Sequence, residues 1–489
     1  MRRRRQLDEQ QQLYVGTATV PILPPLGIDM MGFVNRSTAG LGYGQPMEVQ
    51  ALIAQSGNRR VALLAVDMAL CPLATANQIR EKIATALDCP RHAVLLNINH
   101  SHSLPGFMGD YKLGGACDGY TQEEITFADH VEAMMISAAV KAANKLEEAV
   151  QVCGSMQVEG ISVNRRERTA DGRTILGWNP DGVCDRSVQA VCFKRKDESV
   201  ITTIVNFACH PVILGRDIPE YSSDYIGAIR TSVKQLIGGE CMFLQGAAGN
   251  ILPLEAFLEK KGKEVEFGKL VAMKAVEAIF YPIYPEIVIQ KHDFGSVTPI
   301  SLYRKYMHIN QAEQAIVDSI EELVHFPLQE LPTQEQLLAE IHRRELEMSQ
   351  LKEQSASRSL TNPIQYHIDW AKTMLRKIAD GTYSNVVVAP LQAIRIGGIG
   401  ICAAPGEIFN EIGLAVKARS QAKMTMYAGY SNGLLGYFAT ADEYPHRGYE
   451  PYVSHRGFSQ PAPFDPSCEQ LLVDKGSALV NRLFPLGIK

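Results

Sequence analysis

A pair of histidines separated by one residue follows a short apolar segment near residue 100. Arg91–Leu96 includes the run His92-Ala93-Val94-Leu95-Leu96, which predicts a buried strand, and the chain continues as Asn97-Ile98-Asn99-His100-Ser101-His102-Ser103-Leu104-Pro105-Gly106. Because alternate residues of an extended segment face the same side, we expect His100 and His102 to project together. Two neutral imidazoles suit a divalent transition metal, zinc above all. The alternative is that the two histidines have only a structural role in a loop, and a His-x-His pair alone does not distinguish this from a metal site.

Two later segments place a titratable side chain at the carboxyl end of a predicted core strand. The apolar run Ile201–Phe207 leads into a His-Pro pair at His210, and ligands of open α/β sheets collect at such strand ends. Glu407 follows the predicted strand Leu391–Ala403. The helix dipole favours a carboxylate in the first turn of a helix, and the same position would also aim it into a strand-end cleft. A purely structural role stays open for both residues.

Two further segments are rich in turn-forming or small residues. Gly429–Glu450 alternates such residues with tyrosines, including Tyr437 and Tyr449, which favours an ordered functional loop, with aromatic packing as the alternative. Phe243–Pro253 runs from a predicted strand into a turn of small residues. Such a turn lets backbone approach a ligand closely or presents N–H groups to an anion, and a tight packing turn explains it equally well.

The elements that must position these residues alternate between strand and helix. Their patterns predict strands at Leu13–Val20, Glu48–Ala54, Arg60–Ala69, Val200–Cys209, Cys241–Leu244 and Leu391–Ala403, and helices at Thr75–Leu87, Thr121–Leu146, Ser222–Leu236, Gly262–Ile279, Glu407–Ser420 and Cys468–Leu483. This order predicts an α/β fold with mixed central sheets flanked by helices. Residues 310–380 are rich in Glu, Gln, Leu and Lys at helical spacing, with a break at 326–332. We expect them to form an inserted helical arm or cap.

The totals restrict the class of protein. The 489 residues are 46% hydrophobic, with a net charge of −5, which is ordinary for a globular protein and gives no reason to expect nucleic acid. We expect a disordered tail at residues 1–12, no secretory signal, and a single domain over 13–489. We also expect no transmembrane segment, because the apolar window Val61–Leu73 is too short and is interrupted by Asp67. Ten cysteines without a Cys-x-x-Cys pair favour free thiols and a cytoplasmic location.

Taken in order, these motifs resemble the catalytic domain of the neutral (non-lysosomal) ceramidase family. The resemblance rests on the shared order of short motifs between Leu13 and Tyr449. The motifs are Val15–Pro21 and Met31–Phe33 (the family's start), Asn99–Ser103 (its Thr-His-Thr-His-Ser segment), Asn206–His210 with Ser223–Tyr225 and Gly227 (its second zinc histidine), Pro405–Glu407 (its glutamate ligand) and Tyr437–Tyr449 (its Tyr-x-Thr-Thr-x-Glu-Glu-Tyr region).

The resemblance implies a set of roles for individual residues. A zinc ion would be held by His100, His210, Glu407 and Tyr437, while His102, Arg165 and Tyr449 would contact the substrate or handle protons. Two imidazoles, a carboxylate and a phenolic oxygen form a suitable shell for zinc, with one further position open to water. Asp67 and Asp224 are expected either to fix the histidine tautomers or to cap turns.

The sequence also departs from the family. Ceramidases carry Gly-Asp-x-Ser-Pro-Asn where this chain has Gln245–Asn250, and no Ser, Thr or Cys lies between Phe243 and Pro253. The chain also ends at Lys489, which leaves no room for the family's carboxy-terminal immunoglobulin-like domain. We therefore expect a substrate other than ceramide and a role that does not depend on a serine.

These observations predict a zinc-dependent hydrolase that cleaves a linear amide of a small or lipid-like molecule with a metal-activated water. Arg165 or Tyr449 would hydrogen-bond the developing oxyanion, and His102 would carry the proton to the leaving nitrogen. The alternatives are an esterase or lactonase on the same site, a scaffold that has lost turnover with the serine, and a metal-independent protein whose arm recruits a partner. The arm could equally be a contact within a homo-oligomer or a lid.

Overall fold

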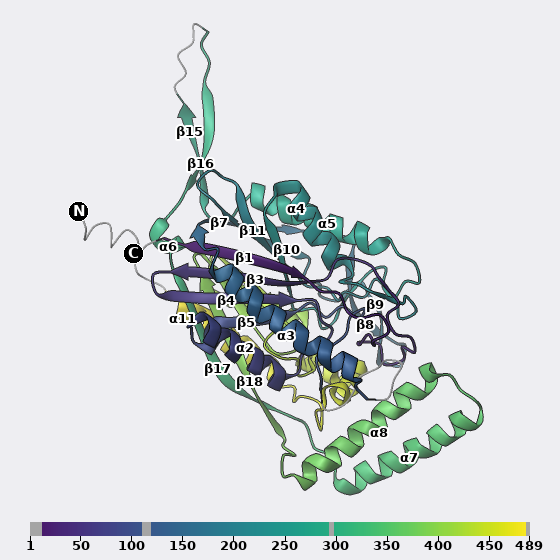
Figure 1. Cartoon of the computed structure of the whole chain (residues 1–489). Coiled ribbons are helices and arrows are strands. Elements are labelled where there is room, and N and C mark those ends of the chain that lie inside the picture. The colour runs from purple at the N-terminus through teal and green to yellow at the C-terminus, as the bar shows by residue number, and fades with distance from the viewer. Residues whose placement is uncertain (1–11, 110–118, 293–297, 486–489) are drawn as a thin grey trace.

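The three main sheets are arranged so that each has one face towards the interior and one towards helices. The computed structural model describes residues 12–109, 119–292 and 298–485; the expected tail at 1–12 therefore lies almost entirely outside the described residues. The predicted α/β class is confirmed, because the main sheets of this part of the chain are mixed and carry helices on their outer faces (Figure 1). None of its helices has both the length and the apolar composition needed to cross a membrane.

Three sheets of four or five strands form the body. The first has the order β5 (Val94–Ile98), β4 (Arg59–Val66), β3 (Glu48–Ser56), β1 (Tyr14–Pro21) and β6 (Glu147–Glu148); the second β13 (Glu240–Gln245), β11 (Val200–Phe207), β10 (Ser187–Lys194) and β7 (Val150–Gln157); the third β17 (Val317–Pro327), β18 (Val386–Ile396), β19 (Ile399–Ala403) and β21 (Met424–Ala428). Each sheet contains one parallel pair, β4 with β5, β11 with β13 and β19 with β21. The carboxyl ends of each pair therefore lie together.

A shared core joins the inner faces of the three sheets. Leu95 of the first sheet, Ile204 of the second and Ile401 of the third belong to one buried apolar cluster. The outer faces are covered by α2 (Leu73–Leu87) and α3 (Gln122–Ala143) on the first sheet, by α4 (Tyr225–Ile237) and α5 (Lys263–Phe280) on the second, and by α9 (Asn410–Arg419) and α11 (Cys468–Leu483) on the third. Thr121 forms a capping box at the start of α3, since its side chain and that of Glu124 each accept a hydrogen bond from the other residue's backbone N–H.

Short elements connect and decorate these layers. They are β2 (Gly42–Tyr43), η1 (Arg91–Ala93), β8 (Ser162–Arg168), β9 (Thr174–Asn179), β12 (Glu220–Tyr221), β14 (Ile251–Pro253), α6 (Gln311–Gln314), β20 (Glu407–Ile408), β22 (Tyr437–Phe438), η2 (Ala441–His446), α10 (Tyr449–Tyr452) and η3 (Ser454–Phe458). A hairpin of β15 (Glu286–His292) and β16 (Leu302–His308) projects from the body (Figure 1).

The helical arm is present but shorter than residues 310–380. It consists of α7 (Gln334–Glu353) and α8 (Arg358–Ala379), which lie side by side (Figure 1). The helical interpretation of residues 317–327 is wrong, because this segment is strand β17, paired along its whole length with β18. Its charged residues gave a helical spacing, but Glu321 pairs with Arg80 and Arg91 of the body. Tertiary pairing therefore overrides the local pattern.

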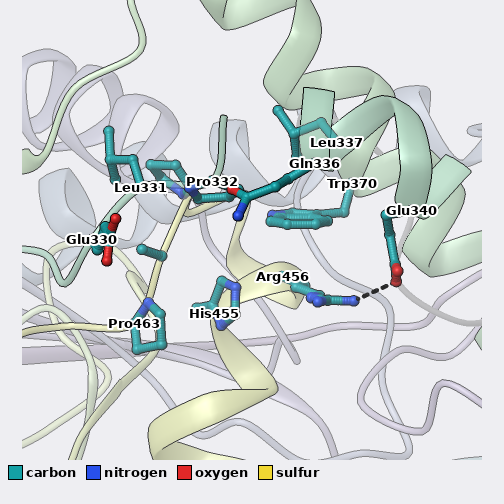
Figure 2. Close-up of a pocket in the computed structure, with 12 residues that line it drawn as sticks. Glu330, Leu331, Pro332, Gln336, Leu337, Glu340, Trp370, His455, Arg456 and Pro463 are labelled. Carbon is teal, nitrogen blue, oxygen red and sulfur yellow. Dashed lines mark hydrogen bonds and ion pairs between the residues drawn. The ribbon is translucent and has the colours of Figure 1, made fainter. Parts of the chain in front are cut away.

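The arm is joined to the body through the segment that follows α10. The Arg456 guanidinium lies over the Trp370 ring, 4.4 Å from its centroid, and donates to Glu340 at 3.1 Å. Trp370 Nε1 donates to the carbonyl of Gln460 at 2.9 Å. Glu340, Trp370 and Arg456, together with three prolines, border a cavity of about 420 Å³ between arm and body (Figure 2). The arm thus packs on the segment 454–460 rather than standing free.

Candidate metal centre and active site

The carboxyl ends of the three parallel pairs converge on one buried point. One side chain or carbonyl arrives from just beyond each of the six strands: Ala69 after β4, His100 after β5, His210 after β11, Ala248 after β13, Glu407 after β19 and Tyr430 after β21. Asn97 of β5 links the sheets here, because its amide donates to the Gly429 carbonyl at 2.7 Å and accepts from Gln245 N at 2.9 Å. This is the strand-end location expected for a ligand in an α/β protein.

The imidazoles of His100 and His210 are held in the same way. Each Nδ1 lies 2.6 Å from a backbone carbonyl oxygen, that of Ala69 for His100 and that of Ala248 for His210. A carbonyl can only accept, so Nδ1 carries a hydrogen, and in the neutral ring each Nε2 then presents a lone pair. Both Nε2 atoms face Glu407 Oε2, at 3.5 Å from His100 and 2.9 Å from His210. Acceptors so close repel each other unless a cation lies among them, and N and O donors of this kind fit zinc.

The histidine tautomers are thus fixed by backbone carbonyls and not by Asp67 or Asp224. Asp67 accepts from Arg230 and Asn99, both at 2.6 Å. Asp224 caps α4 through the backbone N–H of Tyr225. Asp67 and Asp224 therefore stabilise the local structure, and neither of them fixes a histidine tautomer.

His102 meets His100, but not through strand alternation. β5 ends at Ile98, and His100 has φ 62°, so the segment turns instead of extending. The Nε2 atoms of His100 and His102 nevertheless lie 3.2 Å apart, and the ligand atoms of His100, His102 and His210 all lie within 4.8 Å of one another. Burial is the main reason why the pKa of His102 lies well below its usual value, and charge repulsion from His100 and His210 lowers it further. Its Nδ1 is buried and has no hydrogen-bond partner.

Glu407 lies in a short strand and not in the first turn of a helix. β20 pairs in parallel with β22, which places Glu407 opposite Tyr437, and α9 begins only at Asn410. The helix-dipole explanation for this carboxylate is therefore wrong. Burial alone would raise its pKa, but electrostatic interactions with His100, His210 and Arg165 lower it to about 2. The carboxylate is thus ionised at the centre of the cluster.

Tyr430 is a member of the cluster that the sequence motifs did not single out. It is buried, its ring is stacked 4.9 Å from that of His100, and its hydroxyl donates to Glu407 Oε2 at 3.3 Å. Its only signal in the sequence is its place two residues beyond a core strand, the same offset by which His100 follows β5. It is a second tyrosine close to the carboxylate, beside Tyr437.

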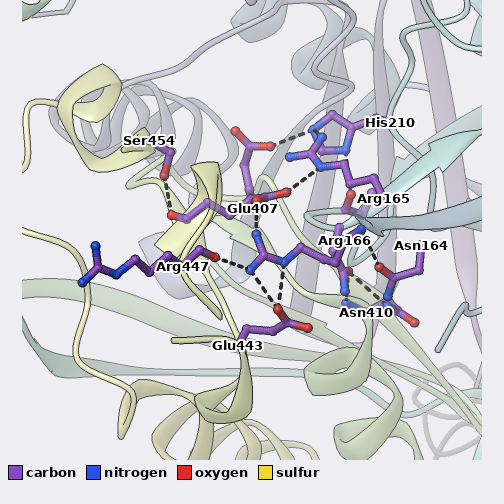
Figure 3. Close-up of polar contacts among 12 residues, drawn as sticks. Asn164, Arg165, Arg166, His210, Glu407, Asn410, Glu443, Arg447 and Ser454 are labelled. Carbon is purple, nitrogen blue, oxygen red and sulfur yellow. Dashed lines mark hydrogen bonds and ion pairs between the residues drawn. The ribbon is translucent and has the colours of Figure 1, made fainter. Parts of the chain in front are cut away.

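Arg165, Tyr437 and Tyr449 complete one side of the cluster. Arg165 Nη1 lies 3.4 Å from His210 Nε2 (Figure 3). Its guanidinium carbon lies over the Tyr437 ring, 5.3 Å from the ring centroid. The rings of Tyr437 and Tyr449 are 5.7 Å apart. Burial alone would lower the pKa of Arg165, but Tyr437, Glu450 and Glu407 raise it overall. All seven residues singled out from the sequence are therefore brought together, whatever their individual roles.

The turn of small residues after β13 supports this cluster with its backbone. The carbonyl of Ala248 holds His210, Gly249 N donates to the Ile408 carbonyl at 2.8 Å, and the Asn250 carbonyl accepts from Arg165 N at 2.8 Å. The segment therefore acts on three site elements although it carries no nucleophilic side chain. Anion binding by its N–H groups is not needed to explain it.

Both the sequence and the fold of this chain are similar to those of neutral ceramidases. Residues 15–243 match the family model described as neutral/alkaline non-lysosomal ceramidase, N-terminal. This part of the chain is similar to the amino-terminal region of the neutral ceramidases. The solved neutral ceramidase from Pseudomonas aeruginosa superimposes with a TM-score of 0.64 at 17% identity, over 97% of this chain and 75% of that one. A ceramidase complexed with C2 gives 0.65 at 17% identity, over 98% and 76%. No curated protein sequence matched.

The relation to neutral ceramidases confirms the resemblance drawn from short motifs. At this identity the structural match establishes the fold, which extends over nearly the whole chain. The match over residues 15–243 includes the segments of His100, His102, Arg165 and His210. The segment Gln245–Asn250, which carries no serine, lies just beyond the matched residues.

Proposed function

We propose that this protein is a zinc-dependent hydrolase that cleaves the amide bond of an N-acylated amine, with water as the nucleophile. The observation that carries the proposal is the convergence of His100 Nε2, His210 Nε2 and Glu407 Oε2, with both Nδ1 hydrogens donated to carbonyls behind the rings. With both imidazoles neutral, three buried atoms direct lone pairs towards one point. The relation to neutral ceramidases supports the amide as the bond that is cleaved.

The metal would be held by His100, His210 and Glu407, with Tyr437 as the fourth ligand. Pairing of β20 with β22 places Tyr437 directly opposite Glu407, and the Tyr437 ring is stacked 6.4 Å from that of His210. When bound, zinc would polarise the substrate carbonyl and lower the pKa of a water molecule towards neutrality. His102 and Tyr430 border the same point and are the competing ligands.

The neighbouring side chains would handle charge and protons. Arg165 Nη2 is buried and has no hydrogen-bond partner, so it can donate to the carbonyl oxygen as negative charge develops there. A single donor of this kind is typically worth about 3–4 kcal/mol. His102 would accept the proton of the attacking water and pass it to the leaving nitrogen, and Tyr449 would orient the substrate.

A cavity beside the cluster, lined by both apolar and polar side chains, supports an acyl group as part of the substrate. The cavity has a volume of about 550 Å³, and its lining includes Leu70, Phe107, Leu434 and Phe458. It borders the site, because Leu70 follows the residue that holds His100 and the Phe458 ring lies 6.1 Å from that of Tyr437. Burial of each methylene of an acyl chain there would contribute about 0.8 kcal/mol.

Paired substrates test the proposal. The purified protein is assayed with an N-acyl amide and with the ester of the same acyl chain, before and after removal of metal by a chelator. We expect amide hydrolysis that is lost with the metal and restored by zinc. Hydrolysis of the ester alone would instead assign an esterase. Hydrolysis that survives complete removal of metal would overturn the metal-dependent mechanism, and a metal-free, inactive protein would point to a scaffold.

A further inference from the structure

A buried carboxylate on α10 contacts the arginine that faces the candidate metal centre. Glu450 is 2% exposed, and its two oxygens are taken by different guanidinium groups: Oε1 accepts from Arg165 Nε at 2.8 Å, and Oε2 accepts from Arg166 Nη1. A buried charge is stable only when it is paired in this way. Glu450 itself does not contact the histidines, so its effect on the site must pass through Arg165.

The way in which Arg165 is held leaves its terminal nitrogens on the site side. Glu450 takes Nε only, although the paired terminal nitrogens of arginine are a favoured partner for a carboxylate. Nη1 then lies 3.4 Å from His210 Nε2, and Nη2 is buried without a partner. The guanidinium is planar, so fixing Nε fixes the direction of both terminal nitrogens. Glu450 therefore orients the group without using the atoms that face the site.

The pairing of β8 with β9 is irregular beside this double contact. Consecutive residues of a regular strand point to opposite faces, yet Arg165 and Arg166 both reach Glu450. The register shifts between Asn164 and Arg166, which pair with Asn179 and Leu176, so the extra residue of this β-bulge lies in β9, opposite Arg165. A bulge increases the local twist of the strand pair. Arg165 and Arg166 turn towards the same carboxylate at this irregularity.

The same strand holds the rest of the segment that carries Glu450. Arg166 donates through Nε and Nη2 to Glu443 Oε2 at 3.0 and 2.8 Å, and Nη2 also donates to the Arg447 carbonyl at 2.7 Å (Figure 3). Arg168 donates to both oxygens of Glu443 at 2.8 Å. Segment 443–450 is therefore fixed against β8 at both of its ends, by Glu443 and by Glu450. Glu450 thus has little freedom to move away from Arg165.

We propose that Glu450 is a positioning residue, which holds the terminal nitrogens of Arg165 at the oxygen of the reacting carbonyl. The inference rests on the proposed function, in which Arg165 is an oxyanion donor. Replacement of Glu450 should therefore lower kcat without removing metal. A displacement of about 1 Å in such a group can cost about 100-fold in rate.

A double-mutant cycle separates positioning from general destabilisation. Glu450→Gln, Arg165→Ala and the double variant are compared for kcat, KM, zinc content and melting temperature. We expect Glu450→Gln to lose about 10- to 100-fold in kcat with little change in KM or zinc, and to have no further effect on kcat once Arg165 is alanine. An equal loss of kcat in both backgrounds would overturn the proposal. Glu450→Asp, which keeps the charge but withdraws it by one methylene, serves if Glu450→Gln does not fold.

The matched control is a similar carboxylate far along the chain from the site. Glu321 also gives its two oxygens to different arginines, Arg80 and Arg91, and Glu321→Gln should lower the melting temperature while kcat stays unchanged. A crystal structure of Glu450→Gln gives a result that does not require turnover: Arg165 Nη1 should have left His210. Arg165 in its present place would overturn the inference. If the wild-type protein is inactive but Arg165 is displaced in the Glu450→Gln structure, the result would count against the proposed function and not against the positioning role of Glu450.

Discussion

Replacement of Gly249 by alanine tests whether the small-residue turn sets the geometry of the metal centre. A Cβ on Gly249 would lie 2.5 Å from the carbonyl oxygen of Glu407, whereas ordinary contacts begin at 3.4 Å, so one backbone must move by about 0.9 Å. Metal ligands tolerate errors of only about 0.2 Å. Neither partner is a flexible side chain, and Gly249 is not in the left-handed region, so space alone decides the outcome.

We expect Gly249→Ala to weaken zinc binding by about 10- to 100-fold, as for other changes behind metal ligands, and to cost about 1–3 kcal/mol of stability from overpacking. Zinc affinity is measured by competition with a chromophoric chelator, and stability by denaturant unfolding of the metal-free protein. Gly42→Ala is the control, because the nearest atom to its Cβ lies at an ordinary 3.4 Å. Wild-type zinc affinity in Gly249→Ala would refute the idea that this turn holds Glu407 in place.

Three further predictions concern single side chains. His100→Ala should lose both zinc and turnover, whereas His102→Ala should keep zinc and lose turnover; loss of metal from both, by elemental analysis, would make His102 a ligand. Tyr430→Phe removes the hydroxyl that donates to Glu407 at 3.3 Å, and we expect it to cost about 1 kcal/mol of zinc binding in a competition titration. Burial and Arg456 lower the pKa of His455 to about 3, so its folded form resists protonation; stability should fall by about 2 kcal/mol from pH 7 to pH 5. His455→Gln should show a smaller fall in denaturant unfolding, and an unchanged fall would contradict this.

The fold could be predicted largely because its elements carry strong local patterns. The capping box at Thr121 marks the start of α3, and the residues Ile79, Ile83 and Leu87, spaced along one face, are buried in α2. The error at residues 317–327 has a physical cause. Its charged side chains follow a helical spacing, but they find partners on other elements of the body once the strand is paired. Sequence spacing alone cannot show such partners.

The sequence predicted the site residues whose side chains follow core strands, but not the main-chain groups that hold them. His100, His210 and Glu407 share one position, just beyond a core strand, and the structure brings them together. The groups that fix the two ligand histidines are main-chain carbonyls, which leave no mark in a sequence. The bulge in β9 opposite Arg165 also leaves no mark in the sequence, because it depends on the register of β8 with β9. Main-chain geometry is therefore what the motifs could not supply.

The most direct test is a crystal structure of the zinc-loaded protein with diffraction data recorded on both sides of the zinc absorption edge. We predict a single strong anomalous peak at the point where the carboxyl ends of the three parallel strand pairs meet. It should be bonded to His100 Nε2, His210 Nε2 and Glu407. A protein that takes up no zinc, or a peak bonded to none of these three atoms, would contradict the proposed metal centre.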